Sequence, residues 1–248
     1  MTQIPSTSSV LRVLFRADMT TQWRNRRSAV LSLVVPVIIL IALKNAVDTI
    51  GANYALSTCI TIGVAASCLM GYTNALARDR DKGVFQRLRV GPVPTWTIMG
   101  SRLLVQMMMI FFTAVAVFLA GYYVDHIQIA LEQYLLGLLA TLVAGVVYLG
   151  LAQLLVGLIK NPETVNSTTR LVYLVFIVVG LYGGSGKLGT VMQQITLWSP
   201  YGTVSQVLAA SMRSGAWNQD ITNALLVALG YAVVFAGIGI RKFSWSSR

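Results

Sequence analysis

Long, almost unbroken runs of hydrophobic residues dominate the chain, and polar residues are confined to the segments between them. A helix of about 20 apolar residues crosses the ~30 Å hydrocarbon core of a bilayer. Six runs meet this description, although the fifth is short and must borrow Thr168, Thr169 and Arg170 to cross. The runs are Ala29–Val47, Ala55–Leu76, Leu103–Val124, Tyr134–Ile159, Leu171–Gly184 and Ala224–Ile240. The pattern predicts an all-α membrane protein with six transmembrane helices.

The basic residues divide unequally between the segments that connect these runs. If the N-terminus is cytoplasmic, every one of the 19 Lys and Arg residues lies on the cytoplasmic side except Lys44, Lys187 and Arg213. Membrane proteins concentrate Lys and Arg in their cytoplasmic loops. We therefore expect both the N-terminus and the C-terminus in the cytoplasm.

The composition agrees with a membrane protein, since 56% of the residues are hydrophobic, 11% are charged and the mean hydropathy is +0.70. The net charge of +11 comes from the excess of Lys and Arg in the predicted cytoplasmic segments. No nucleic-acid partner is expected, because apolar runs separate the basic residues and no continuous basic stripe forms. Cys59 and Cys68 would lie on opposite faces of one helix without a surrounding Cys/His cluster, so we expect no metal site.

Residues 1–28 precede the first run and are longer and more polar than the leader of a secretory signal peptide, so we expect no such peptide. Within them, Leu11, Phe15, Met19 and Trp23 recur at intervals of four. This spacing predicts an amphipathic helix in the cytoplasmic interface, with its apolar stripe among acyl chains and its arginines near headgroups. The alternative is a helix packed on the cytoplasmic surface of a partner protein.

Residues 185–220 are too polar to cross the membrane as one helix and too apolar for a plain extracellular loop. Two short helices broken at Ser199 and Pro200 fit the pattern, and the first would dip into the outer leaflet as a re-entrant region. Trp198, Tyr201 and Trp217 are expected at the outer interface, where amphipathic aromatic rings are favoured.

The stretch GGSGKLGT at residues 183–190 looks at first like a phosphate-binding loop. Such a loop requires G-x-x-x-x-G-K-[ST], but Leu181 stands at the position of its first glycine and Leu188 at the position of its hydroxyl. The stretch also lies on the predicted outer side of the membrane, where ATP is absent. We expect a flexible turn here and no nucleotide site.

Residues 77–102 form the predicted cytoplasmic segment between the second and third spans, and most of it reads RDRDKGVFQRLRVGPVPTWTIMGSR. Alternating charges continue the second helix into solvent, and Gly83 loosens it. Gly91, Pro92 and Pro94 break the helix before another begins near Thr95. A protrusion of this shape fits a groove on another protein, and a solvated loop without a special role is the alternative that these residues leave open.

The same residues resemble a motif of ABC-2-type permeases, the membrane subunits of many ABC exporters. These commonly carry R-E-R-E-x-G-T-x-x-R-L and then x-P-V-S-x-x-x-I-L-x-G-K after their second span, where this chain has RDRDKGVFQRL and GPVPTWTIMGSR. The matching positions are Asp79, Asp81, Gly83, Arg87, Pro92, Val93 and Arg102. The chain departs from the motif with two Asp for Glu and at Val84, Pro94, Thr97 and Ser101. The resemblance extends over residues 1–248 as a single ABC-2-type transmembrane domain.

The resemblance implies roles for this segment, which would couple the chain to a cytosolic ABC ATPase. The residues that would enter a groove on that ATPase are Arg87, Arg89, Gly91, Pro92, Val93, Pro94, Thr95, Trp96 and Ile98. The residues that would transmit force are Arg78, Asp79, Arg80, Asp81 and Gly83, with the two acids paired to basic residues of a neighbouring helix. Such permeases act as dimers with a second permease chain, and the partner ATPase binds ATP and Mg²⁺. We therefore expect no cofactor in this chain and no enzymatic activity of its own.

Polar residues inside the spans are the candidates for a translocation path, since polar groups in hydrocarbon face the protein interior or a cavity. The candidates are Thr61, Thr73, Asn74 and Gln106. Hydrogen bonds to the residue's own helix or to a neighbouring helix are the alternatives. The mostly apolar spans favour a hydrophobic or amphipathic substrate such as a drug, an antibiotic or a lipid-like molecule.

Other classes explain the sequence less well. A proton-coupled secondary transporter needs an ionisable group in mid-membrane, and no carboxylate or His lies there. A membrane-embedded enzyme needs converging groups, whereas Asp79 with Asp81 and Asp125 with His126 are isolated pairs. We expect an exporter permease in a bacterial inner membrane, surrounded by lipids. A polysaccharide or glycolipid exporter is the alternative within the same family.

Overall fold

The structure is a computed structural model that describes residues 7–24, 26–44, 47, 50–90, 95–182 and 189–243. Every regular element among them is a helix, as the sequence predicts. In chain order the helices are α1 (Thr7–Arg24), α2 (Arg26–Ala42), α4 (Ala52–Ala65), η1 (Ala66–Thr73), α5 (Asn74–Asp81), α6 (Val84–Val90), α7 (Thr95–Tyr123), α8 (Leu131–Leu158), α9 (Pro162–Tyr182), α10 (Thr190–Trp198), α11 (Pro200–Ser211) and α12 (Gln219–Lys242). Because η1 is a π-helical stretch that joins α4 to α5, these three form one continuous rod.

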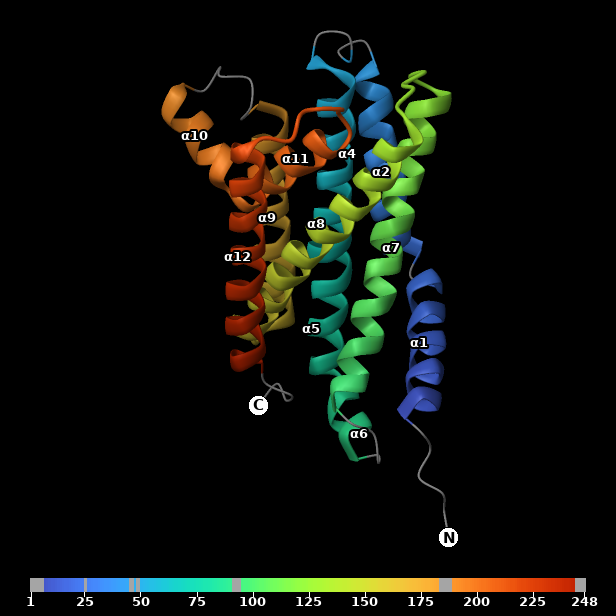
Figure 1. The fold of residues 1–248 in the computed structure, drawn as a ribbon. Helices are drawn as coiled ribbons and strands as arrows, with labels where there is room; N and C mark the ends of the chain where they lie inside the picture. Colours follow the sequence, from blue (N-terminus) through green and yellow to red (C-terminus); the bar gives the residue numbers. More distant parts are fainter. Residues whose placement is uncertain are drawn as a thin grey trace.

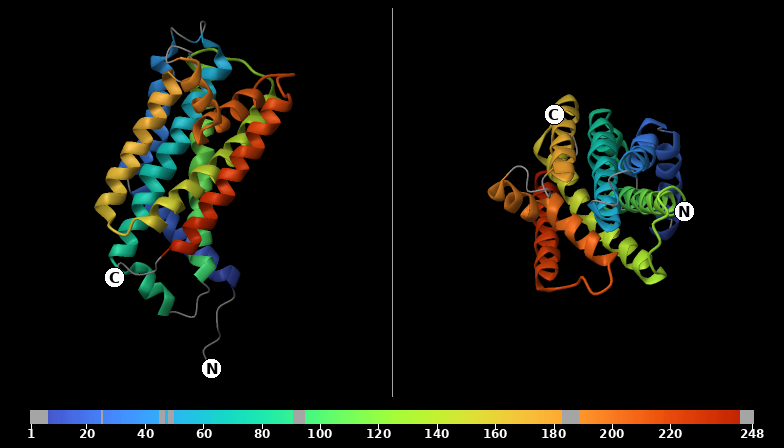
Figure 2. Two further views of the ribbon diagram at one scale, coloured as in Figure 1. Left: turned by 90° about the vertical axis from the view of Figure 1, so that its left-hand side faces the viewer. Right: turned by 90° about the horizontal axis from the view of Figure 1, so that it is seen from above.

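The long helices run side by side with this rod among them (Figures 1 and 2). The rod contacts α2, α7, α8, α9 and α11. Of the most apolar 18-residue stretch of the rod, 89% is buried, whereas only 22% of the corresponding stretch is buried in α9 and in α12. The outer faces of α9 and α12 expose large apolar side chains such as Leu174 and Val233. A water-soluble protein would bury such side chains, so these faces suit contact with lipid.

Five helical segments are long and apolar enough to cross a membrane. They are Ala52–Asp81, Trp96–Tyr123, Leu131–Leu158, Pro162–Tyr182 and Gln219–Lys242. These match the second to sixth predicted spans. The first predicted span falls on α2, whose apolar part within the described residues is the shorter Leu33–Ala42. The crossing of α2, and with it the total of six spans, stays a prediction.

The fifth predicted span changes most between sequence and structure. Its helix α9 begins at Pro162, well before the first apolar residue of the run, Leu171. Asn161 explains this start, because its Oδ1 accepts hydrogen bonds from the backbone N–H of Glu163 (2.8 Å) and of Thr164 (3.3 Å). The helix therefore includes Thr168, Thr169 and Arg170, as the sequence predicts.

The described ends of the chain and α6 lie together at one end of the bundle, the lower end in Figure 1. The residues 124–130, α10 and α11 lie at the other, upper end. Among the described basic residues, Lys44 follows α2 and Arg213 follows α11, both at the upper end. Helices α5 and α6, Lys82 between them and the last turn of α12 lie at the lower end, and these helices carry Arg78, Arg80, Arg87, Arg241 and Lys242. Which end faces the cytoplasm stays a prediction.

A helix expected in residues 1–28 is present as α1. Helix α1 runs along the lower half of α7 and packs against it (Figure 1). The half-buried residues Leu11, Leu14, Phe15 and Asp18 share the face towards the bundle. A spacing of four advances each residue by about 40° around a helix, so Trp23 turns out of this face and is exposed. No residue of the stripe is fully buried by the chain, so its place in the cytoplasmic interface stays a prediction.

The break between α10 and α11 falls at Ser199 and Pro200, as predicted. Ser199 caps α11 by accepting a hydrogen bond from the backbone N–H of Gly202 (3.0 Å), and Pro200 takes the first helical position. Gly202 is required by this turn, because a Cβ there would lie 1.9 Å from the carbonyl oxygen of Thr196. How deeply α10 enters the outer leaflet stays a prediction.

The three aromatic residues of this region do not share one environment. Trp198 and Trp217 are exposed near the upper end, where an interfacial position remains open to them. The expectation for Tyr201 is wrong, since its ring is buried with its centroid 6.1 Å from that of Phe176 on α9. Gly180 leaves room for this ring, because a Cβ at Gly180 would meet the Tyr201 hydroxyl.

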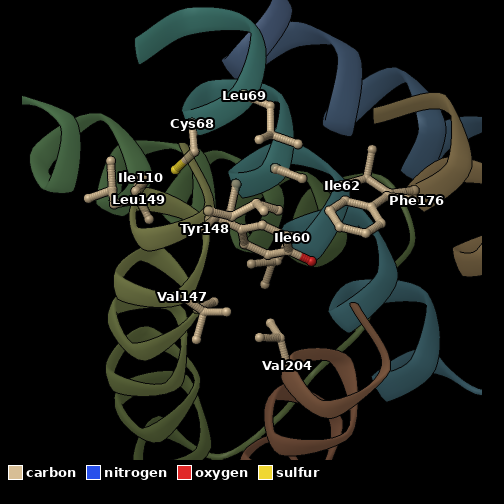
Figure 3. Packing of buried hydrophobic residues seen from close by; sticks show 14 of the residues in the cluster. Ile60, Ile62, Cys68, Leu69, Ile110, Val147, Tyr148, Leu149, Phe176 and Val204 are labelled. Carbon is tan, nitrogen blue, oxygen red and sulfur yellow. The ribbon is translucent and has the colours of Figure 1, made fainter. Parts of the chain in front are cut away.

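The core lies where the rod meets α7, α8, α9 and α11. Figure 3 shows Ile60, Leu69, Tyr148, Phe176 and Val204 converging from several of these helices. Cys59 and Cys68 are buried free thiols within the same cluster, where they pack as small apolar side chains. The core thus fixes the rod, while the lower end of the bundle carries the charged contacts that follow.

Candidate functional site

Arg102, in the second turn of α7, joins three helices at the lower end of the bundle. Its Nη1 lies 2.6 Å from Asp79 Oδ2 on α5, and its Nε lies 4.0 Å from Asp18 Oδ1 on α1. The neighbouring Ser101 Oγ donates a 2.5 Å hydrogen bond to the other oxygen of Asp18. We call Asp18, Asp79, Phe85, Ser101 and Arg102 the Arg102 hub.

Phe85 extends the hub to α6 and to the end of α12. The Arg102 guanidinium carbon lies 4.8 Å from the centroid of the Phe85 ring, within the range of a cation–π interaction. The Phe85 ring is fully buried and also packs edge-on against Phe243, with 6.0 Å between the ring centroids. Phe85 of α6 therefore contacts both Arg102 of α7 and Phe243, the residue after α12.

The charges of the hub are partly removed from water. The side chain of Arg102 is 14% exposed and that of Asp79 is 31% exposed, so the pair lies between a surface ion pair and a buried one. Burial raises the pKa of Asp18, and the hydrogen bond from Ser101 and the positive charge of Arg102 oppose this shift only in part. Asp18 is therefore a carboxylate whose charge is tolerated because Ser101 and Arg102 face it.

Arg80 is a second unusual cation, next to Asp79 on α5 but directed at a different helix. Its side chain is buried, and it donates hydrogen bonds to the carbonyl oxygens of Val156 (2.6 Å), Ile159 (2.7 Å) and Lys160 (2.7 Å). The last carbonyls of a helix have no partner within the helix and carry its negative dipole end. Arg80 thus closes the C-terminal end of α8 and ties α5 to it.

The predicted force-transmitting residues divide into contacting and exposed ones. Asp79 forms the expected ion pair with a neighbouring helix, and Arg80 makes the backbone contacts just described. Arg78 and Asp81 are exposed, and neither forms an ion pair within the described part of the chain. Gly83 makes the turn from α5 to α6, where its φ of +68° favours glycine. Their role in transmission stays a prediction.

Part of the predicted ATPase-coupling segment, Gly91, Pro92, Val93 and Pro94, lies outside the described residues. The helices on either side are present, since α6 ends at Val90 and α7 begins at Thr95. Arg89 belongs to α6. Arg87 and Trp96 are exposed and available to a partner, whereas Ile98 is buried against its own chain. Contact with an ATPase therefore stays a prediction for the whole segment.

The four predicted translocation residues are buried and bonded inside the chain. They are Thr61, Thr73, Asn74 and Gln106. Both threonine hydroxyls donate to backbone carbonyls of their own helix. The Asn74 amide reaches Thr169 Oγ1 on α9 at 3.4 Å, and Gln106 donates to Ser67 on η1. These bonds involve every one of the four side chains, although the buried Asn74 Oδ1 has no hydrogen-bond partner among the described residues. A part in the translocation path stays a prediction.

Sequence reasoning missed Asp18 and Ser101 and did not assign a contact to Arg102. For Asp18 a signal was present, because residues 11 and 18 lie on nearly the same side of a helix with 3.6 residues per turn. A carboxylate on the apolar face of a helix needs a partner when that face is buried. No spacing in the sequence identifies Ser101 and Arg102 as that partner, since α1 and α7 are distant in the chain.

Comparison with known families gives one match. The model of a family described as ABC-2 family transporter protein matches residues 19–241, which include every helix from α2 to α11 and nearly all of α12. A comparison with curated proteins found no significant match.

Proposed function

The chain belongs to the ABC-2 family of transporter proteins, and we propose that it is the permease subunit of an ATP-driven exporter for a hydrophobic or amphipathic substrate. Membership of this family implies an ABC ATPase as partner. In the proposal that ATPase alone binds and hydrolyses ATP, and two permease chains, identical or related, form the membrane path. A chain with several apolar spans supplies such a path without chemistry of its own.

The observation that carries the proposal is the Arg102 hub. It lies on α6 and in the first turns of α7, the described helices on either side of the segment that the ATPase would contact, and it links α1, α5, α6 and α7. A loop without a role in coupling has no need for a partly buried ion pair at its base, because desolvating two charges is costly. A joint that must move several helices together does need such contacts.

The proposed transmission runs from α6 and α7 into the rod. A partner that displaces α6 acts on Phe85, and through the guanidinium above it on Arg102 and Asp79. Because Arg80 holds the last carbonyls of α8, a tilt of α5 also moves α8. The rod and α8 contribute most of the core, so their joint motion would change the bundle interior that a substrate has to pass.

The proposed orientation places the ATPase, whereas export is proposed from the family resemblance. The basic lower end would face the cytoplasm, and the ATPase would bind there. The apolar outer faces of α9 and α12 favour a substrate that reaches the protein from the membrane or from its inner surface. A drug, an antibiotic or a lipid-like molecule has these properties.

The experiment is a purification of the tagged chain from its native membrane, followed by reconstitution with whatever ATPase accompanies it. We expect an ATPase with a phosphate-binding loop to co-purify and its hydrolysis to rise with one class within a panel of lipophilic compounds. Stimulation by sugar polymers alone would replace the proposed substrate class. Transport without any ATPase, driven by an ion gradient, would refute the function itself.

A further inference from the structure

A groove of about 620 Å³ lies between α7, α8 and α12 in the lower half of the bundle. Leu103 and Met107 line it from α7, Leu149 from α8, and Ile240 and Phe243 from the end of α12. The hub and the predicted translocation residues do not line this groove. Its volume is in the range of sites for small organic ligands.

The groove opens on the outer surface of the bundle, which would face the hydrocarbon if these helices cross the membrane as their length and composition suggest. Leu103, Val146 and Ile240 are lining residues whose side chains are exposed on the outer surface of apolar helices. Trp96 stands at the lower edge with 64% of its surface exposed, which suits a ring at the level of lipid headgroups. An occupant therefore has an apolar part at the depth of Met107 and a polar part near Trp96.

Two polar side chains lie in the part of the groove that is nearer to the lower end. The Tyr72 hydroxyl donates a long, 3.4 Å hydrogen bond to Gln153 Oε1. The Gln153 side-chain nitrogen has no hydrogen-bond partner among the described residues. Gln153 lies about two turns further down α8 than Val146, so its free donor is at the depth where the ester oxygens of a lipid would be.

The rim of the groove at the lower end is positively charged. Arg241 and Lys242 lie in the last turn of α12, between the lining residues Ile240 and Phe243. Both are exposed, and neither forms an ion pair within the described ranges. Clustered Lys and Arg beside an apolar surface at the membrane boundary attract anionic headgroups.

We propose that this groove binds an anionic phospholipid of the leaflet at the lower end. One acyl chain fills the space between α7, α8 and α12, the ester region lies at Gln153, and the phosphate lies at Arg241 and Lys242. The inference is independent of the transported substrate. Bound lipid would stabilise the end of α12, whose Phe243 packs on Phe85 of the hub.

The experiment titrates the delipidated full-length protein with phosphatidylglycerol and with phosphatidylcholine of the same acyl chains, and counts bound lipid by native mass spectrometry. We expect phosphatidylglycerol to bind at least ~10-fold more tightly. Changing both Arg241→Gln and Lys242→Gln should weaken phosphatidylglycerol by about 25-fold, at roughly fivefold per cation, and leave phosphatidylcholine unchanged. The matched control changes the upper-end cations with Lys44→Gln and Arg213→Gln.

The apolar part is tested with Gly100→Leu, since a Cβ at this lining glycine meets nothing within 4 Å and the larger side chain projects into the groove. We expect both lipids to weaken at least ~10-fold. The control Gly230→Leu adds the same side chain at an open position of α12 outside the groove and should have no effect. Equal affinity for the two lipids, unchanged binding by Gly100→Leu, or an equal loss in the upper-end control would overturn the proposal.

Discussion

The ion pair between Asp79 and Arg102 allows a direct test of the hub as a mechanical joint. A double-mutant cycle compares Asp79→Asn, Arg102→Gln and the combined variant with the unchanged protein. Asp79→Asn leaves Arg102 with only the more distant Asp18, and Arg102→Gln leaves Asp79 without its cation, at a site where the side chains of Asp79 and Arg102 are 31% and 14% exposed. The combined change removes both charges, so we expect it to be less harmful than the sum of the single changes.

The exposure of the two side chains determines the expected coupling free energy between Asp79 and Arg102. Two unit charges about 4 Å apart attract by about 4 kcal/mol at an effective dielectric constant of ~20. Exposed pairs retain less than about 1 kcal/mol of this, and breaking a fully buried pair costs about 3–5 kcal/mol. The intermediate exposure places the coupling free energy at about 1–3 kcal/mol. In a chain of this length 1 kcal/mol shifts Tm by roughly 2–4 °C, so Arg102→Gln should lower Tm by about 2–12 °C.

The assay measures thermal unfolding in detergent by tryptophan fluorescence, and then ATPase stimulation after reconstitution with the partner. Arg102→Gln should reduce the ratio of stimulated to unstimulated hydrolysis, and the combined variant should not restore it. The control is Arg213→Gln, since Arg213 is exposed and forms no ion pair within the residues that the structure describes. Additive single effects, within about 0.5 kcal/mol, would show that the two charges are not coupled and refute the joint.

Three further changes address other parts of the lower and upper ends. Burial raises the pKa of Asp18 above its unfolded value of 3.8. The contribution of Asp18 to stability is therefore full below that value and is lost as pH rises through the folded-state pKa, so Tm should fall between about pH 4 and 8. Asp18→Asn should remove this fall in Tm. Arg80→Met leaves the carbonyl of Val156 in α8 and those of Ile159 and Lys160 just after it without their donor. It should lower the free energy of unfolding by about 3–5 kcal/mol in a denaturant titration; an effect below ~1 kcal/mol would contradict the closure of α8. Gly202→Ala should abolish the folded protein in size-exclusion chromatography, because its Cβ would overlap a backbone oxygen, whereas Gly230→Ala, at an open helical position, should be stable and elute unchanged.

The sequence was most informative for features that depend on the residues of one helix alone. Apolar runs located five of the described spans, and the serine and proline at 199 and 200 located the turn between α10 and α11. Boundaries were less accurate where a polar cap extends a helix beyond its apolar run, as Asn161 does for α9. A run of hydrophobic residues indicates which part of a helix suits the hydrocarbon core of the membrane. A capping residue indicates where the backbone hydrogen bonds of the helix begin.

Contacts between distant helices could not be predicted, since periodicity within one helix does not identify its neighbour. Tyr201 illustrates this limit, because an aromatic residue near a predicted interface is equally suited to a gap beside Gly180 on α9. Arg80 is a second case. The alternating charges of residues 78–82 suggested a solvated helix, but an interval of one residue turns the side chain by about 100°, enough to take Arg80 from solvent to the buried end of α8.

This difference in direction between adjacent residues explains how one short helix can serve as a joint. Asp79 holds α5 to α7, and Arg80 holds the same turn of α5 to the end of α8. The two contacts differ in strength, because the ion pair is partly hydrated whereas the backbone contacts of Arg80 are buried and closely fitted. Under a force applied at α6, the contact between α5 and α7 should therefore yield first, while α5 and α8 move as one body. Disulfide crosslinking of α5 to α8 should preserve ATPase stimulation, and crosslinking of α5 to α7 should abolish it; the reverse result would refute this order.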